Sequence, residues 1–388
     1  MAGPSALKDA VREAIDGQRS GLVALSHAIH DSPETAFEEE RACAWTADAL
    51  AEGGFTVTGG VAGMATAFSA EIGSGPLVVA VCAEYDALPG VGHACGHNII
   101  AASAVGAGLG LARVADQLGI TVRVLGTPAE EGGGGKVTML EAGVFEDVHA
   151  AMMIHPWPED RLEGTCLAVS HFDVTFGGKS AHASAAPWEG VNAGDAMAIA
   201  QVAIGMLRQQ FRLGDQVHGI VTDGGQAANI IPDSVRGRFM CRSTSLAGLE
   251  VLEPRVMACF EAGALATGSS LTAESLAPVY SHMESDSALL SLYRSNAEAL
   301  GRSFELDDSD QPRPTFSTDM ANVSLAVPTI HPLVAIDAAG SVNHQPEFAA
   351  ACITPSADAA VRDGALAMAW TVIDAAQPGP QRDRLLAR

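Results

Sequence analysis

Residues 84–98 (Glu-Tyr-Asp-Ala-Leu-Pro-Gly-Val-Gly-His-Ala-Cys-Gly-His-Asn) gather side chains that can bind metal ions. The segment holds two carboxylates, Glu84 and Asp86, together with two histidines and Cys95. An apolar run at 76–82 precedes it and predicts a buried strand, and a run of small residues follows it and predicts a helix. Carboxylate, imidazole and thiolate groups are common ligands of zinc and related ions. The pattern therefore predicts a metal site at the end of a strand, as in many hydrolases.

Other polar residues also follow strand-like runs. Glu130 and Glu131 come just after one such run, His155 after the next, and His344 after an apolar stretch near the C-terminus. In a parallel sheet the carboxyl ends of the strands meet at one edge, so we expect these side chains to converge. The predicted metal ligands are Cys95, His97, Glu131, His155 and His344.

Five ligands of these types suffice for two divalent ions with positions left open for water. Two ions about 4 Å apart can clamp and activate a water molecule for attack on an amide. Glu130 would then be the general base that takes the proton of the water and later returns it to the leaving amine. Adjacent glutamates can divide these tasks because successive side chains point in different directions.

Each of these residues has an ordinary structural interpretation when it is taken alone. A single histidine is usually a surface or core residue, Cys95 alone would be a buried thiol, and two glutamates alone would be a solvated loop. Gly135-Lys136 resembles a phosphate-binding loop, but Val137 follows where a serine or threonine is required. The predicted convergence, rather than any single residue, favours the metal site.

The elements that would position these residues alternate along the chain. Strand-like runs near 65–71, 77–83, 121–126 and 150–154 are separated by helical patterns at 98–118 and 136–143, after a first helical pattern at 5–29. This alternation predicts an α/β domain with a mostly parallel mixed sheet flanked by helices. The same pattern resumes after about residue 283.

The intervening part of the chain has a different order of elements. Strands at 171–176, 218–222, 235–241 and 271–280 and helices at 194–211 and 246–267 follow the order β-α-β-β-α-β. That order predicts a ferredoxin-like α+β domain inserted into the first domain. The predicted boundaries are 1–167 and 282–388 for the first domain and 168–281 for the insertion.

The insertion carries its own polar residues, His182, Asn229 and Arg242. A histidine and an asparagine suit the oxygen of a polarised carbonyl, and an arginine suits a carboxylate. Arg242 could equally form a structural ion pair.

Composition excludes some partners. The chain has 388 residues with 46 acidic and 22 basic side chains, a formal net charge of -24. It lacks the basic surface that nucleic acids or anionic membranes require. The longest apolar run is too short to span a bilayer, and we expect no secretory signal. Seven scattered cysteines suit a reducing compartment, so we predict a cytoplasmic protein.

Taken together, these motifs resemble the dinuclear-metal aminoacylase and carboxypeptidase family (peptidase family M-twenty), which includes hippurate, auxin-conjugate and aminobenzoyl-glutamate hydrolases. The resemblance extends from His30-Asp-Ser-Pro-Glu34 to His344-Gln-Pro. The form of residues 84–98, together with Ser317-Thr-Asp319, is most similar to the aminobenzoyl-glutamate hydrolase and amidohydrolase branch.

The resemblance implies a metallo-exopeptidase-like catalytic domain with two divalent ions, which would be zinc or manganese, or else cobalt. Cys95 would bridge them where other branches use an aspartate. Glu130 matches the general base of the family. His182 matches a histidine that stabilises the oxyanion in the active site of the partner subunit, since the smaller domain is a lid and a dimerisation surface. Asn229 and Arg242 resemble substrate contacts.

One position departs from the dipeptidase and glutamate carboxypeptidase branches. They have a ligand histidine where Glu84 stands here, so we expect Glu84 and Asp86 to orient the ligands rather than to bind metal. The expected activity is hydrolysis of an amide in an N-acyl amino acid, an aminobenzoyl-glutamate-like conjugate or a dipeptide. Alternatives are a deacetylase or peptidase of other specificity, a catalytically silent metal-binding protein on the same fold, and a two-domain binding protein with a structural metal.

Overall fold

The apolar run before the predicted metal-binding segment forms β3 (Leu77–Ala83), and all residues of this strand are buried in the computed structural model. The structure describes residues 3–307 and 313–388. The chain divides into two compact units, which are Met1–Thr165 with Met283–Arg388 (the first unit) and Cys166–His282 (the inserted unit). β7 (Thr165–Cys166) lies where the chain passes from one to the other.

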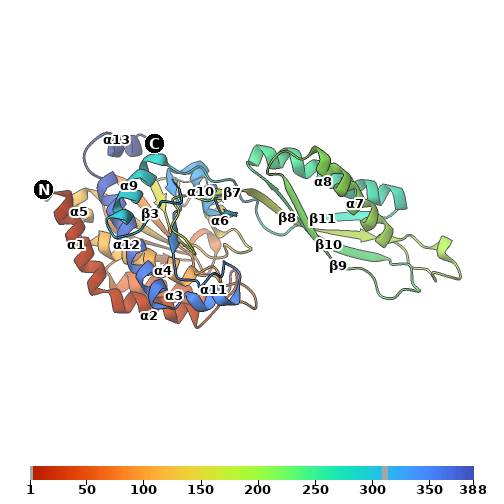
Figure 1. Cartoon of the computed structure of the whole chain (residues 1–388), viewed down its shortest axis with the longest axis horizontal. Coiled ribbons are helices and arrows are strands. Elements are labelled where there is room, and N and C mark those ends of the chain that lie inside the picture. Colours follow the sequence, from red (N-terminus) through yellow and green to blue (C-terminus); the bar gives the residue numbers. More distant parts are fainter. Residues whose placement is uncertain (1–2, 308–312) are drawn as a thin grey trace. The chain divides into compact units, whose positions relative to one another are not determined.

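The first unit is built on a six-stranded sheet with four parallel strands (Figure 1). β4, β3, β5 and β13 run parallel, and β2 and β1 extend the β4 edge in antiparallel fashion. In sheet order the strands are β1 (Thr56–Gly59), β2 (Phe68–Gly73), β4 (Ile120–Gly126), β3, β5 (Ala150–Met152) and β13 (Thr329–Ile330). A short parallel pair, β6 (His155–Trp157) and β14 (Leu333–Ala335), continues from β5 and β13. A further short strand, β12 (Thr315–Phe316), lies outside this sheet and pairs with β7. The mostly parallel sheet predicted from the alternation is confirmed.

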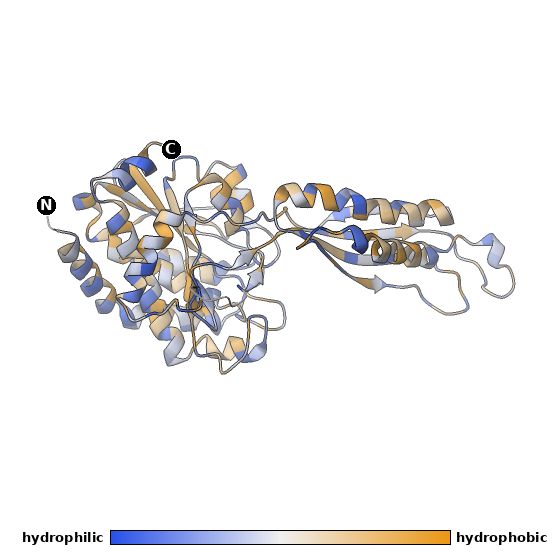
Figure 2. Ribbon diagram, turned by 45° about the horizontal axis from the view of Figure 1, so that its top comes forward, coloured by the Kyte–Doolittle hydropathy of each residue, from blue (hydrophilic) through white to orange (hydrophobic). Residues whose placement is uncertain are grey.

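Helices cover both faces of this sheet. Val79 and Val81 of β3 pack into a core with the helices on one face, while Val78 and Cys82 pack into a second core on the other. The first face carries α1 (Pro4–Gly17), α2 (Arg19–His30), α3 (Glu40–Glu52), α4 (His97–Ala112), α9 (Ser287–Glu298) and α12 (Pro355–Ala375). The second carries α6 (Gly135–Glu141) and α10 (Met320–Ala326). Burial on both faces explains why β3 reads as a continuous apolar run, and the strands appear mainly in hydrophobic colours in Figure 2.

The remaining helices of the first unit are short: α5 (Ala115–Leu118), α11 (Pro346–Ala351) and α13 (Pro380–Leu386). The helix predicted at 5–29 is in fact two helices, because Gln18 (φ -98, ψ 0) leaves helical geometry directly after Gly17. Glycine has a low helix propensity, which allows this break. The helix predicted at 98–118 likewise ends at Ala112, and non-helical Val114 separates it from α5.

The run of small residues in α4 allows close packing of helices. An added Cβ on Gly106 would lie 2.9 Å from atoms of both Leu22 and Ala365, so α4 approaches α2 and α12 closely only because glycine stands there. This packing fixes α4 in the core, and its first residue is His97.

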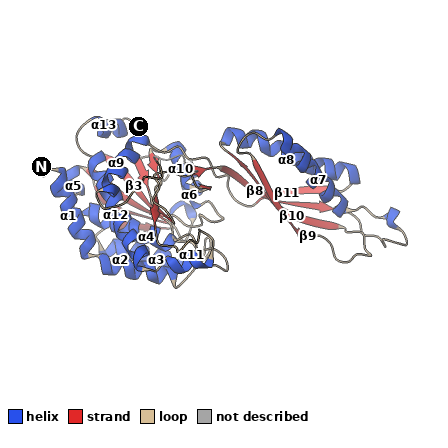
Figure 3. Ribbon diagram, viewed as in Figure 1, coloured by secondary structure: helices blue, strands red, loops and turns tan. Residues whose placement is uncertain are grey.

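The inserted unit is a four-stranded antiparallel sheet with two helices on one face (Figure 3). In chain order its elements are β8 (Ala168–Gly177), α7 (Ala193–Leu207), β9 (Gln216–Asp223), β10 (Ser234–Ser243), α8 (Leu246–Thr267) and β11 (Ser270–Ser275). The sheet order is β11-β8-β10-β9, which is the ferredoxin-like arrangement predicted from the order of elements. Along β10, Val235, Phe239 and Cys241 are buried in the core with α7 and α8, and the alternate residues lie on the opposite face.

Candidate metal centre

The candidate metal centre forms where β3 ends and α4 begins. Glu84 and Asp86 follow β3 directly, and His97 opens α4 after a loop. Gly96 precedes α4 with a positive φ of 75°, and a Cβ there would lie 2.8 Å from Pro156 and 3.2 Å from the sulfur of Cys352. Both the backbone angle and the close approach require glycine, which places Cys95 and His97 on either side of a tight turn.

The five predicted ligands fall into two groups that share one residue. Ligand atoms of Cys95, His97 and His155 lie within 4.8 Å of one another, and so do those of Cys95, Glu131 and His344. A sulfur common to two three-residue groups is the arrangement expected for a thiolate between two ions. Two buried atoms in these groups, Nε2 of His97 and Oε1 of Glu131, have no hydrogen-bond partner among the described residues. A cation would satisfy both, so the residues present fit two divalent ions.

Asp86 orients two members of these groups. Its Oδ1 lies 2.9 Å from Nδ1 of His97, and its Oδ2 accepts a hydrogen bond of 2.9 Å from the backbone N–H of Glu131. Burial would raise the pKa of Asp86, but the charge of His97 and these hydrogen bonds hold the pKa below its usual value. A carboxylate on Nδ1 leaves Nε2 of the ring to face the other ligands.

Glu84 belongs to a fully buried cluster of three charges. The ammonium of Lys136 donates to Glu84 and, at 2.7 Å, to Oδ1 of Asp319, while its backbone N–H donates to Oδ2 of Asp319 at 2.9 Å. Burial lowers the pKa of Lys136, but the negative charges of Asp319 and Glu84 have the larger effect and raise this pKa above its usual value. The second oxygen of Glu84 lies 3.6 Å from Nε2 of His97.

Glu130 is buried on the same side of His97. Its Oε2 lies 3.9 Å from Nε2 of His97, and Glu84, His97 and Glu130 form a third group of ligand atoms within 4.8 Å of one another. Burial, followed by the negative charges of Glu84 and Glu131, raises the pKa of Glu130 well above its usual value. A carboxyl group in this environment can hold a proton that an exposed one would release.

His155 is oriented by its own neighbour and meets a histidine that the sequence patterns did not single out. Nδ1 of His155 donates to the carbonyl of Pro156 at 2.8 Å, and its ring centre lies 5.5 Å from that of His331. His331 is 4% exposed, and both of its ring nitrogens lack hydrogen-bond partners in the part of the chain that the structure describes. It follows β13 directly, so the strand-end rule that identified His155 could also have found it. The sequence relates Lys136 only to a phosphate-binding loop, and no local pattern pairs it with Glu84 or Asp319.

His182, Asn229 and Arg242 lie on the inserted unit, whereas the five predicted ligands lie together in the first unit. Nδ1 of His182 lies 3.3 Å from the backbone N–H groups of Ser184 and Ala185. Because Nδ1 accepts from these groups, the ring proton lies on Nε2, which can donate a hydrogen bond. Asn229 is adjacent, since its carbonyl accepts from the N–H of Ala183 at 3.0 Å.

Arg242 lies on the face of the inserted sheet opposite the helices. Burial lowers its pKa, and its charge contributes, after burial, to lowering the pKa values of His171 and His218. Both histidines lie opposite Met240 on the strands that flank β10. Arg242 is therefore a half-buried cation beside two imidazoles that favour the neutral form.

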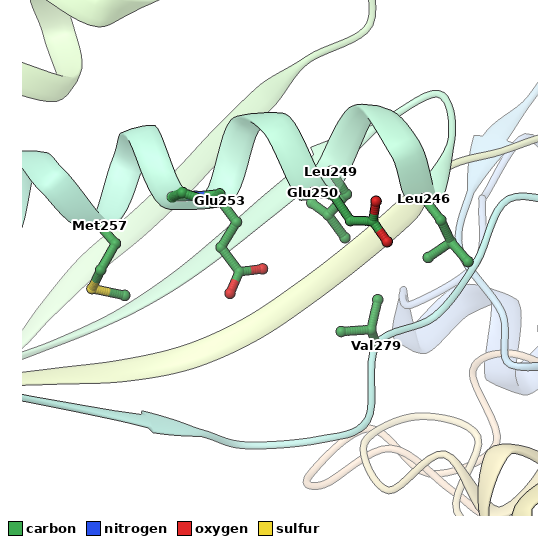
Figure 4. Close-up of a pocket in the computed structure, with 7 residues that line it drawn as sticks. Leu246, Leu249, Glu250, Glu253, Met257 and Val279 are labelled. Carbon is green, nitrogen blue, oxygen red and sulfur yellow. The ribbon is translucent and has the colours of Figure 1, made fainter.

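A separate groove of about 570 Å³ runs along α8 of the inserted unit (Figure 4). Leu246, Leu249, Met257 and Val279 line it together with Glu250, Glu253 and Pro254. No predicted site residue lines this groove, so it has no part in the chemistry described above.

No helix within the described residues is long and apolar enough to cross a membrane. A family model described as peptidase family M20/M25/M40 matches residues 80–362. The chain is 39% identical over 388 residues to the Xaa-Arg dipeptidase of Mus musculus, covering 95% of this chain and 88% of that protein. It is 32% identical over 282 residues to a subunit of the p-aminobenzoyl-glutamate hydrolase of Escherichia coli K12, covering 67% of this chain and 59% of that one.

Solved structures share the fold. The aminobenzoyl-glutamate utilization protein from Klebsiella pneumoniae has a TM-score of 0.76 at 18% identity, covering 95% of this chain and 99% of that one. A dinuclear metal-binding M20 peptidase, the YXEP protein of Bacillus subtilis, has a TM-score of 0.69 at 21% identity, covering 92% and 98%. With the matched family model and the relatives above, these comparisons show that the chain belongs to peptidase family M20/M25/M40 and is a hydrolase of peptide or other amide bonds.

Proposed function

We propose that this protein is a two-metal hydrolase that cleaves a dipeptide or an N-acyl amino acid. The observation that carries the proposal is the pair of ligand groups that share Cys95, with Glu130 beside them. One ion would be held by Cys95, His97 and His155, and the other by Cys95, Glu131 and His344. The thiolate and imidazoles favour zinc, while manganese and cobalt are compatible with the mixed ligands.

Two divalent ions held by these residues would supply a Lewis acid for the substrate carbonyl and would lower the pKa of a water molecule. Glu130 would take one proton of the attacking water while the water oxygen bonds to the carbonyl carbon of the substrate. When the carbon–nitrogen bond breaks, Glu130 gives this proton to the leaving amine, so the carboxylate is regenerated. Asp86 would hold the ring of His97 and the backbone of Glu131 in place during both steps, through the hydrogen bonds at its two carboxylate oxygens.

The inserted unit would supply substrate contacts to the active site of the partner subunit. Nε2–H of His182 is a donor suited to the oxyanion of the tetrahedral intermediate, and Asn229 lies beside it. Arg242 suits the carboxylate of a C-terminal residue. The 39% identity to the mouse Xaa-Arg dipeptidase favours a dipeptide as the substrate, ahead of an aminobenzoyl-glutamate conjugate.

We also infer a homodimer formed through the inserted unit. α7 exposes an apolar row, Ile199, Val202 and Met206, and β9 is an edge strand of the sheet. Edge strands and exposed apolar rows both favour association with another chain. A cytoplasmic location remains a prediction, and the seven cysteines, all free, are compatible with it.

The proposal is tested with protein stripped of metal and then reloaded with zinc, manganese or cobalt. The substrates are Xaa-Arg and other dipeptides, aminobenzoyl-glutamate and N-acetyl amino acids. We expect two ions per chain and hydrolysis that depends on them. Two bound ions with no hydrolysis of any of these amides would instead support a catalytically silent metal-binding protein. Full activity of the stripped protein would exclude a two-metal mechanism.

A further inference from the structure

The two glutamates of the metal centre are held by a carboxylate that the sequence patterns did not single out. We propose that Glu39 is a positioning residue that sets the placement of Glu130 and Glu131 by binding the backbone of Ala129, at the start of the turn that carries both glutamates. The inference rests on the proposed function for the roles of these two glutamates. The contact itself joins two segments of the first unit that are 90 residues apart.

Glu39 is fully buried at the residue before α3, and its Oε1 accepts a hydrogen bond of 2.9 Å from the backbone N–H of Ala129. Burial, and then the charge of Asp86, raise its pKa to about 7. The protonated and ionised forms both keep an oxygen that can accept from Ala129. A neutral glutamine is therefore a close substitute, whereas an apolar side chain is not.

Ala129 has an unusual backbone for its residue type. Its φ is 61°, in the left-handed region that alanine disfavours, and its carbonyl accepts from Gly133 at 2.9 Å and from Gly134 at 2.8 Å. A Cβ on Gly133 would lie 2.4 Å from the ring of Phe37, so the turn also packs on the segment that carries Glu39. The left-handed conformation persists because both of its backbone polar groups and its packing are fixed.

The residues on either side of Glu130, Ala129 and Glu131, each donate a backbone hydrogen bond to a carboxylate. Glu39 binds the N–H of Ala129 on one side, and Asp86 binds the N–H of Glu131 on the other. Asp86 also contacts the ring of His97, so its replacement would disturb a ligand directly. Glu39 instead binds the backbone of the turn, and its effect on the centre is transmitted through that backbone.

A nearby carboxylate offers a matched control. Glu34 accepts hydrogen bonds from the backbone N–H groups of Arg41 at 2.9 Å and Ala42 at 3.0 Å, so it fixes the start of α3. It belongs to the same segment as Glu39, but these bonds hold the helix rather than the 129–134 turn. Replacing Glu34 disturbs the segment without releasing Ala129.

The experiment compares E39Q, E39L and E34A in the full chain. E39Q and E39L both remove the charge at similar volume, and only E39Q keeps an acceptor. Each variant is measured for kcat and KM on a hydrolysed dipeptide, for zinc affinity by chelator competition, and for its melting temperature.

We expect E39L to lower kcat by about 10- to 100-fold with little change in KM, since small misplacements of catalytic groups have effects of that size. It should also weaken the ion bound through Glu131 without releasing the ion held by His155. E39Q should keep kcat within a few-fold of the wild type. E34A should lower the melting temperature and leave kcat nearly unchanged.

The proposal fails if E39L retains wild-type kcat and zinc affinity, or if E39Q is as impaired as E39L. It also fails if E34A reduces kcat as much as E39L does at equal loss of stability. An inactive wild type would refute the proposed function instead, and zinc affinity would still decide whether Glu39 positions Glu131.

Discussion

Cys95 is shared by the group with His97 and His155 and the group with Glu131 and His344. Its replacement should therefore have a larger effect than that of a residue in only one group. His155 belongs only to the first group and His344 only to the second. If the sulfur lies between two ions, its removal affects both, whereas the loss of either histidine affects one.

We therefore expect Cys95→Ala to lose both ions and His155→Ala or His344→Ala to lose one each. Elemental analysis after dialysis against a weak chelator measures the ion content per chain. Two ions retained by Cys95→Ala would show that the sulfur is not shared.

Glu130 and Glu131 have different proposed roles although they are adjacent. Glu130→Gln removes the proton acceptor and should reduce kcat by about 10²- to 10⁴-fold, the range of general-base catalysis, with both ions still bound. Glu131→Gln is the matched control, because it should weaken ion binding itself. Steady-state kinetics with parallel metal analysis separates the two, and a Glu130→Gln enzyme of wild-type kcat would exclude this residue as the base.

At the scale of elements, the three charges of Lys136, Glu84 and Asp319 join α6, the end of β3 and the start of α10. All three side chains are completely buried. Removing one member of a buried ionic cluster leaves charges that neither water nor a partner compensates.

Lys136→Met should therefore destabilise the protein by about 3–5 kcal/mol in urea unfolding. Adding Glu84→Gln to the same chain should recover part of that loss. Arg313→Met, which removes a surface pair with Glu163 at 3.3 Å, is the control and should change stability by less than about 1 kcal/mol. A similar effect of Lys136→Met and Arg313→Met would show that the cluster contributes little.

The elements were largely predictable from the sequence because their signals are local. The apolar run of β3, the small residues of α4 and the β-α-β-β-α-β order each lie within a short window. The convergence of His155 and His344 followed from one rule about parallel sheets. The break at Gln18 was missed because a helical pattern of apolar residues continues across it.

The supporting residues could not be predicted in this way. Glu39 acts on Ala129 and Lys136 on Asp319, and such pairs are brought together only by packing. Glu39 stands in the acidic stretch Glu38-Glu39-Glu40, and Lys136 follows a run of glycines, so neither shows its partner in the sequence. His331 was the exception, since its position after a strand was visible.

At the scale of the whole molecule, the inserted unit offers surfaces that one chain does not cover. Val202 and Met206 of α7 are 59% and 71% exposed, and β9 has an open edge. Leu265 on α8 is 87% exposed but is a single residue near the end of its helix.

We expect Val202→Glu with Met206→Glu to convert a dimer to a monomer, because two buried carboxylates would oppose association. Leu265→Glu should leave the dimer intact. Sedimentation velocity measures the mass of each variant, and metal content reports that the first unit is unaffected. A dimer that survives the double substitution would exclude this surface.

The two ligand groups differ in their access to water. His97 is 1% exposed, whereas the side chain of His344 is 61% exposed. A dissociating ligand that meets water is replaced more readily than one enclosed by protein, so the two ions should differ in kinetic lability. A strong chelator should remove one equivalent rapidly, the one held by His344, and the other far more slowly. Such a protein would pass through a half-loaded form whenever the supply of metal falls.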